Sequence, residues 1–203
     1  MAYTAKQFHL TGLDGISDKQ LESHYKLYEG YVTNLNKIND QLSQLAKDGK
    51  GGTPDYNELK RRFGFEFDGM RLHEYYFSNM KPNGGDLHDG DLKSKIVETF
   101  GTYDAWKMDF INTGLVRGIG WSAFYIDNLT GQLFNVWIGD HEHNHPVAAT
   151  MLMIMDVWEH AYTGDYLPTE RKKYAEAFMK NVNWTVVEKR FSQVKVGEVA
   201  VFA

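Results

Sequence analysis

Four polar residues stand in or beside apolar segments, where a side chain that binds a metal ion would be held rigidly. His24 lies on an apolar stripe that recurs every three or four residues, and His73 stands among leucine and aromatic residues. Asp156 directly follows the apolar run Met151–Met155, and His160 comes four residues later. A buried carboxylate requires a cation or strong hydrogen bonds, because an unpaired buried charge is very costly. A metal ion shared with imidazoles would supply that compensation.

Each of these residues also has an ordinary structural explanation. A single histidine on an apolar face more often bonds a backbone carbonyl in the core, and Asp156 with His160 fits a structural ion pair equally well. The residue types alone therefore indicate a candidate site of mixed histidine and carboxylate ligands. Ligands of that kind suit iron, manganese or zinc.

The composition removes several other classes of protein. The chain has no cysteine, which excludes disulfides, thiol nucleophiles, iron–sulfur clusters and blue-copper sites. Its net charge of −5 gives no basic excess, so we expect no nucleic-acid partner. The N-terminus lacks an apolar signal core, and the run Met151–Met155 is too short to cross a bilayer. These features predict a cytoplasmic protein that does not associate with membranes.

The first half of the chain predicts two long helices. Ser17 and Gln20 have the spacing of a capping box, and the apolar stripe continues from there to about Leu45. A glycine-rich break follows, and a second helical region spans roughly residues 55–80, which Gly64 could divide. Pro82 and the two glycines after it end this region. We therefore predict an N-terminal helical hairpin domain over residues 1–85.

The second half predicts an α+β domain over residues 86–203 that completes the metal site. Two short aromatic and β-branched runs, joined by a turn at residues 128–131, have the pattern of a hairpin, and a third apolar run follows. The expected strands are 121–127, 132–138 and 150–157, and the expected helices are 92–100, 103–116, 173–182 and 184–191. This order predicts a three-stranded antiparallel sheet with flanking helices.

Motifs spread along nearly the whole chain resemble those of iron/manganese superoxide dismutases. The most specific is Asp156-Val157-Trp158-Glu159-His160-Ala161-Tyr162, which resembles the family signature that carries two metal ligands. The others, in order, are His24-Tyr25 with Tyr31-Val32-Thr33-Asn34-Leu35-Asn36, His73 with Tyr76, Pro82 and Gly84-Gly85, Gly118-Ile119-Gly120-Trp121, and Val182-Asn183-Trp184. The family fold is a helical hairpin followed by an α+β domain, which agrees with the division above.

The resemblance implies a role for each candidate residue. The metal ligands would be His24, His73, Asp156 and His160, and Tyr31 resembles the gateway tyrosine of the family. Glu159 would bond His160 of a second subunit across a two-fold axis, which implies a homodimer, with a tetramer as the alternative. The residues expected around the ligands are Tyr28, Tyr76, Trp121, His143, Trp158 and Glu159.

The donor to metal-bound solvent would come from the sheet side of the site. In the family it is a glutamine on the second-ligand helix, or a glutamine or histidine on the sheet; the helix position here is Gly69. Counting 15 residues back from Asp156 reaches His141, the spacing of members with a histidine donor. His143 would share its face if the strand continued. A solvated histidine-rich loop is the alternative.

The chain also departs from the family pattern. Tyr28 stands where the family has a second histidine, and Thr163 stands where a tyrosine of the partner subunit normally meets it. His24 and Tyr31 are separated in the sequence by one residue fewer than is usual in the family. Phe77, Arg71 and Ala123 replace tryptophans. These changes place the catalytic rate and the dimer geometry in question.

The implied activity is dismutation of superoxide, with redox cycling of one iron or manganese ion per subunit. The histidine donor favours iron slightly. The alternative is a related metal-binding protein with weak or no dismutase activity, for which the changes at Tyr28 and Thr163 are the motive. A zinc hydrolase has less support, because no His-Glu-x-x-His helix is present.

Overall fold

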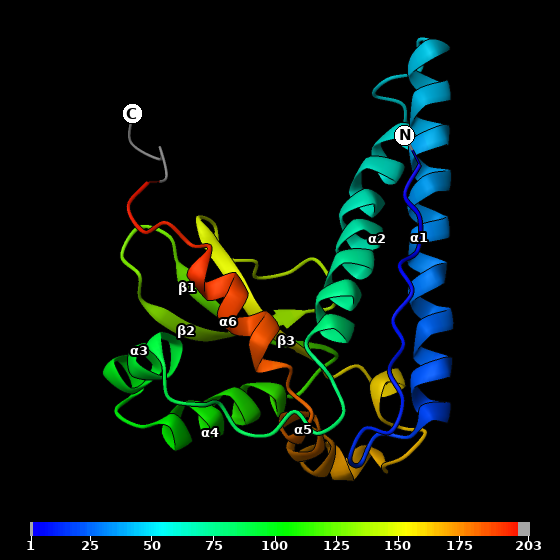
Figure 1. The fold of residues 1–203 in the computed structure, drawn as a ribbon. Helices are drawn as coiled ribbons and strands as arrows, with labels where there is room; N and C mark the ends of the chain where they lie inside the picture. Colours follow the sequence, from blue (N-terminus) through cyan, green and yellow to red (C-terminus); the bar gives the residue numbers. More distant parts are fainter. Residues whose placement is uncertain (1, 199–203) are drawn as a thin grey trace.

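Two long antiparallel helices form one side of the molecule (Figure 1). The computed structural model describes residues 2–198, in which α1 spans Asp18–Lys47 and α2 spans Pro54–Ser78. The Ser17 hydroxyl accepts the Gln20 N–H at 3.1 Å, so the predicted N-cap is confirmed. The helix α2 runs unbroken through Gly64, and the division considered there does not occur.

The buried face of α1 has the spacing that the sequence predicts. Its buried side chains recur every three or four residues and pack against α2: Gln20, Leu21, His24, Tyr28, Val32, Leu35, Ile38 and Leu42. The whole segment is regular α-helix, with no π-bulge between His24 and Tyr31. Seven residues are close to two helical turns, so the two side chains share a face.

A small sheet with helices around it forms the other side of the molecule (Figure 1). The strands β1 (Gly120–Asp127), β2 (Leu133–Gly139) and β3 (Ala149–Asp156) are antiparallel in the order β2-β1-β3. The helices around them are α3 (Asp91–Phe100), α4 (Tyr103–Gly114), α5 (Arg171–Lys180) and α6 (Trp184–Ser192). Two short 3₁₀ turns, η1 (Glu159–Ala161) and η2 (Pro168–Glu170), follow the sheet.

The predicted α+β architecture is therefore confirmed, and each expected strand and helix begins and ends within two residues of its predicted ends. The division at residue 85 stays a prediction. Residue 1 of the first predicted domain and residues 199–203 of the second lie outside the described part of the chain.

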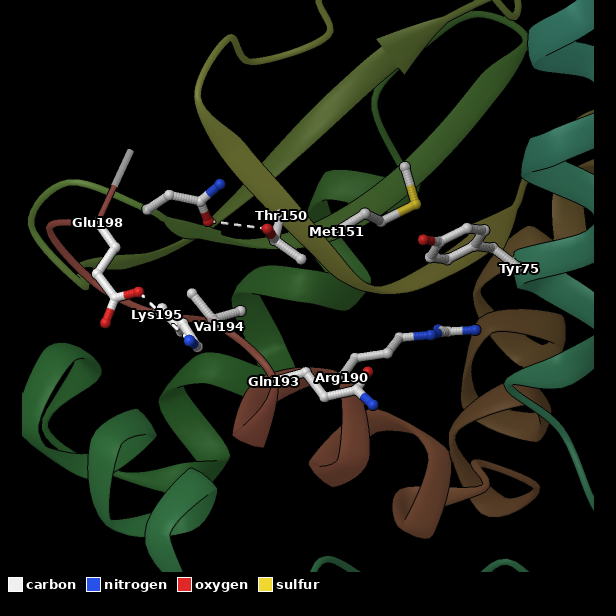
Figure 2. Close-up of a pocket in the computed structure, with 9 residues that line it drawn as sticks. Tyr75, Thr150, Met151, Arg190, Gln193, Val194, Lys195 and Glu198 are labelled. Carbon is white, nitrogen blue, oxygen red and sulfur yellow. Dashed lines mark hydrogen bonds and ion pairs between the residues drawn. The ribbon is translucent and has the colours of Figure 1, made fainter. Parts of the chain in front are cut away.

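The two sides are joined where α2 packs on β3. Asn79, at the end of α2, donates to the Ile154 carbonyl at 2.7 Å, and Arg190 of α6 donates to Asn79 Oδ1 at 2.6 Å. Figure 2 shows the Arg190 side chain reaching from α6 toward Tyr75, where its guanidinium carbon lies 4.2 Å from the ring centre. These contacts fix the end of α2 relative to β3. Over the described residues, every helix is too short or too polar to span a bilayer.

Candidate metal centre

The four predicted ligands meet at one point between the helical hairpin and the sheet. His24 comes from α1, His73 from α2, Asp156 from the last position of β3 and His160 from η1. One potential ligand atom from each of them lies within 4.8 Å of the other three. The first three are buried, and His160 keeps 22% of its side chain exposed. Two halves of the chain thus contribute to a single cluster.

One oxygen of Asp156 is the centre of this cluster. Its Oδ2 atom lies 3.0 Å from His24 Nε2, 3.5 Å from His73 Nε2 and 3.4 Å from His160 Nε2. The other oxygen, Oδ1, accepts the backbone N–H of Trp158 at 2.8 Å, which fixes the orientation of the carboxylate. The backbone of Asp156 is fixed as well, because this residue pairs with Trp121 of β1 in the sheet.

The hydrogen bond of His73 determines which of its nitrogens carries the proton. Its Nδ1 lies 2.5 Å from the Gly69 carbonyl, which can only accept, so the hydrogen is on Nδ1. His73 Nε2 therefore presents a lone pair to the anionic Asp156. Among the described residues, neither His73 Nε2 nor His160 Nε2 has a hydrogen-bond partner. Lone pairs that converge in the core in this way fit a metal cation and would repel one another without one.

Burial sets the protonation states that a metal requires. It lowers the pKa of His24, and it lowers the pKa of His73 well below the usual range. Burial by itself would raise the pKa of Asp156, but the facing His160 and His24 rings outweigh it and hold that pKa well below its ordinary value. Neutral imidazoles around an ionised carboxylate are the forms in which these groups bind metal.

A single glutamine, which sequence reasoning assigned only to the helix cap, ties two of the ligand-bearing elements together. Gln20 donates to the His160 carbonyl at 2.6 Å and accepts the Gly164 N–H at 2.8 Å. Its side chain is therefore committed to the turn η1, and the reciprocal half of the predicted capping box does not form. Gln20 lies one helical turn before His24, so this contact holds η1 against the part of α1 that carries the ligand.

Tyr31, His141 and Trp121 form a hydrogen-bonded chain beside the cluster. Trp121 Nε1–H donates to His141 Nδ1 at 3.1 Å, which leaves the His141 hydrogen on Nε2. That group donates to the Tyr31 hydroxyl oxygen at 2.7 Å, and Tyr31 keeps its own hydrogen for a second partner. Burial lowers the pKa of His141 to about 4, so the ring is neutral, and burial raises the pKa of Tyr31.

Gly69 makes this position of Tyr31 possible. A Cβ atom at residue 69 would lie 2.6 Å from Cδ1 of the Tyr31 ring, closer than carbon atoms can approach. In part of the family this helix position carries a glutamine; here it is Gly69, and the Tyr31 ring fills the space beside it. His141, from the loop after β2, is the polar side chain that bonds the Tyr31 hydroxyl.

Aromatic rings enclose the cluster. Trp158 stacks on His141 with 4.8 Å between ring centroids and on His160 with 5.5 Å, and Trp121 meets His73 edge-on at 5.0 Å. The Tyr76 ring lies 5.1 Å from His24, and its hydroxyl bonds the Tyr174 hydroxyl at 3.0 Å. Tyr174 in turn donates to the Asp156 carbonyl at 2.7 Å. The site is therefore packed by large side chains on several sides.

Three predicted residues lie further from the cluster. The strand β2 ends at Gly139 and Asp140 has a positive φ of 51°, so His141 and His143 do not share a face. The His143 side chain is 66% exposed and faces Asp140 at 3.6 Å. Glu159 is exposed in the single chain. Tyr28 is buried, with its ring centroid 6.4 Å from that of His73.

Sequence reasoning missed Glu74, which immediately follows His73. This carboxylate is 5% exposed and bonds Tyr28, Lys6 and Arg71. The available signal was a glutamate within an aromatic helix segment, adjacent to a candidate ligand. Its partners come from three separate segments, which the local pattern does not reveal.

The comparisons with known proteins agree with this geometry. The family profile "Iron/manganese superoxide dismutases, C-terminal domain" matches residues 88–190. A "Superoxide dismutase [Fe]" of Aquifex aeolicus is 34% identical over 186 residues, which cover 89% of this chain and 86% of the relative. A "Superoxide dismutase [Fe]" of Cupriavidus metallidurans is 35% identical over 89% of this chain and 90% of its own. A "Superoxide dismutase [Mn] 2" of Haloferax volcanii is 32% identical, with 88% of each chain covered. The chain therefore belongs to the iron/manganese superoxide dismutase family.

Proposed function

We propose that this protein is a superoxide dismutase that uses one iron or manganese ion held by His24, His73, Asp156 and His160. The observation that carries the proposal is the convergence of imidazole nitrogens on one ionised carboxylate oxygen, in a chain of this family. The relatives named above are superoxide dismutases of both metal types, which supports the reaction. The choice between iron and manganese must therefore be argued from this chain's own residues.

The overall reaction converts two superoxide anions and two protons into oxygen and hydrogen peroxide. A bound iron or manganese ion supplies the one-electron redox chemistry, because it is stable in both the 2+ and 3+ states. Peroxide formation also consumes protons, so the chain must deliver them to a site enclosed by aromatic rings. This second task falls to its own side chains.

The chain of Tyr31, His141 and Trp121 is suited to proton delivery. Trp121 fixes the His141 tautomer, His141 donates to Tyr31, and the Tyr31 hydroxyl hydrogen is left available for a further acceptor. The raised pKa of Tyr31 keeps its hydroxyl protonated, so it can act as a donor. We assign Tyr31 and His141 this role. Trp121, Trp158 and Tyr76 restrict the space around the ligands, whereas the exposed His143 lies too far toward solvent to take part.

We infer that iron is the preferred metal. The imidazole on the sheet side is His141, which donates its one N–H to Tyr31, and it can therefore act on metal-bound solvent only through the Tyr31 hydroxyl. Hydrogen bonds around a metal site tune the reduction potential of the bound metal. Metal analysis of protein from unsupplemented cells, followed by activity of the iron- and manganese-reconstituted forms, tests this choice.

We also propose an isologous homodimer in which Glu159 bonds His160 of a second subunit. Glu159 is exposed in the single chain, and it directly precedes the one ligand that is partly exposed. An interface there would bury both side chains, and the imidazole N–H would compensate the carboxylate.

The activity is tested by superoxide consumption of protein loaded with iron or manganese, compared with the free ion at equal concentration. The loaded protein is expected to exceed the free ion by several orders of magnitude per metal. The Asp156→Ala variant is expected to bind no stoichiometric metal and to lose the activity. A loaded wild-type protein no faster than the free ion would instead support the alternative of a metal-binding relative without dismutase activity.

A further inference from the structure

We propose that Tyr28 and Glu74 form a buried tether that holds the His73 ring in position for metal binding, and that the N-terminal segment completes it. Tyr28 and Glu74 are positioning residues, since they act through His73. This inference rests on the proposed metal site and adds a device that the family signature does not contain.

Glu74 is a buried carboxylate with three donors. Its Oε2 atom accepts from Arg71 Nη1 at 2.6 Å and from Lys6 Nζ at 2.8 Å, and its Oε1 atom accepts from the Tyr28 hydroxyl at 3.1 Å. Charge-assisted hydrogen bonds of this kind are shorter and stronger than neutral ones. Glu74 directly follows His73 on α2, so its bonds to Lys6 and Tyr28 hold the helical turn that carries the ligand against the N-terminal segment and α1.

The direction of the Tyr28 hydrogen bonds is fixed by its partners. The Lys6 backbone N–H can only donate, and it lies 2.8 Å from the Tyr28 oxygen. The hydroxyl hydrogen therefore goes to Glu74 Oε1. Burial raises the pKa of Tyr28 to about 12, so the hydroxyl stays protonated. A hydroxyl with both its partners in place holds the ring in a single orientation.

That orientation places the Tyr28 ring beside His73. The two rings are nearly parallel, with 28° between their planes and 6.4 Å between centroids. Trp121 and His24 meet His73 edge-on at 5.0 Å each. The Tyr31 ring is also close, with 5.1 Å between its centroid and that of His73. Tyr28 completes this packing, and a loose Tyr28 would give the His73 ring room to move relative to Asp156.

The N-terminal segment, residues 2–16, contributes directly to the tether. Lys6 donates its backbone N–H to Tyr28 and its ammonium group to Glu74. Tyr3 makes two hydrogen bonds with Asn36 of α1: its backbone N–H donates to Asn36 Oδ1 at 2.8 Å, and its carbonyl accepts from Asn36 Nδ2 at 2.9 Å. Phe8 packs on Phe77 at 5.4 Å between centroids. Figure 1 shows this segment running alongside α1. It therefore reaches the ligand-bearing face of the hairpin.

The test compares iron-loaded wild type with Tyr28→Phe, Glu74→Gln and the double variant. Tyr25→Phe is the matched control, because it makes the same change on the same helix at a buried hydroxyl that has no hydrogen-bond partner among the described residues. The measurements are the rate of iron release to a chelator and the paramagnetic resonance spectrum of the ferric protein, both at a temperature where circular dichroism shows every variant folded.

We expect Tyr28→Phe and Glu74→Gln each to release iron roughly tenfold faster and to change the ferric spectrum, as loss of an outer partner of a metal ligand generally does. The double variant should be no worse than the stronger single, because both changes break one tether. Tyr25→Phe should match wild type. If Glu74→Gln does not fold, Lys6→Met takes its place in the comparison, because it removes one partly exposed ammonium from Glu74. It should accelerate iron release by a smaller factor.

Two results would overturn the inference in distinguishable ways. Tyr28→Phe and Glu74→Gln proteins with the iron release and spectrum of wild type would refute the tether and leave the metal site intact. A wild-type protein that retains no iron or manganese would refute the proposed function together with the tether.

Discussion

At the scale of single residues, the site depends on which atoms carry hydrogen. The Gly69 carbonyl holds the His73 proton on Nδ1, and Trp121 holds the His141 proton on Nε2. The first assignment turns His73 into a ligand, and the second turns His141 into a donor toward Tyr31. Neutral imidazoles thus take opposite roles because their hydrogen-bond partners differ.

His141 provides the residue-scale prediction. His141→Ala should retain a full complement of metal, because His141 is not among the four clustered residues, but it should change the reduction potential and lower the turnover number by about 10- to 100-fold. His143→Ala is the control, since that side chain is 66% exposed. Redox titration and stopped-flow measurement of superoxide decay check both variants. Equal effects from the two would show that neither histidine has a specific part.

The ligands could be predicted from the sequence, whereas their supports could not. His24, His73, Asp156 and His160 stand in motifs or on apolar stripes, which are local patterns. Gln20 was predicted only as part of a helix cap, because its partners, His160 in η1 and Gly164 after it, lie 140 and 144 residues away in the sequence. Glu74 and its partner Lys6 are separated by 68 residues. Contacts between distant segments leave no periodic signal in either segment.

At the scale of elements, the site lies where β3 ends and η1 turns, against the sides of two long helices. The last residue of β3 is Asp156, the turn η1 supplies His160, and the sides of α1 and α2 supply the other two ligands. The helices were predictable from their apolar period, and the strands from their β-branched and aromatic runs. The strand β2 ends at Gly139 and Asp140 has a positive φ, so the condition under which His143 would share a face with His141 is not met.

Gln20 provides the prediction at this scale. Gln20→Ala removes the contact between α1 and η1 and leaves a partly buried carbonyl and N–H without partners. Each such group costs about 1–3 kcal/mol, so the free energy of unfolding should fall by a few kcal/mol at most. His160 should also move, so metal release should accelerate. Urea denaturation of the apoprotein and a chelator assay of the loaded protein measure the two effects. Gln44→Ala, which breaks a bond on the exposed part of α1, is the control and should change neither.

At the scale of the whole molecule, neither half of the chain holds the complete site. Two ligands come from the helical hairpin and two from the end of β3 and the turn after it, and contacts of α2 with β3 join them. Metal binding should therefore stabilise the contact between the halves and raise the melting temperature of the whole chain.

The dimer provides the prediction at this scale. Wild-type protein at low micromolar concentration should sediment at twice the mass of the 23.4 kDa chain, and Glu159→Ala should shift it toward monomer and loosen the metal. Glu198→Ala, an exposed carboxylate near the C-terminus, should sediment as wild type. A wild-type protein that sediments as a monomer would refute the role assigned to Glu159.

The central claim is that one redox-active metal ion is held by these four side chains. Anomalous diffraction from crystals of iron-loaded protein, recorded on both sides of the iron absorption edge, tests it most directly. We predict one peak per chain, enclosed by the Nε2 atoms of His24, His73 and His160 and by Oδ2 of Asp156, and no such peak in Asp156→Ala crystals. A peak at any other position, or an undiminished peak in the Asp156→Ala protein, would contradict the account.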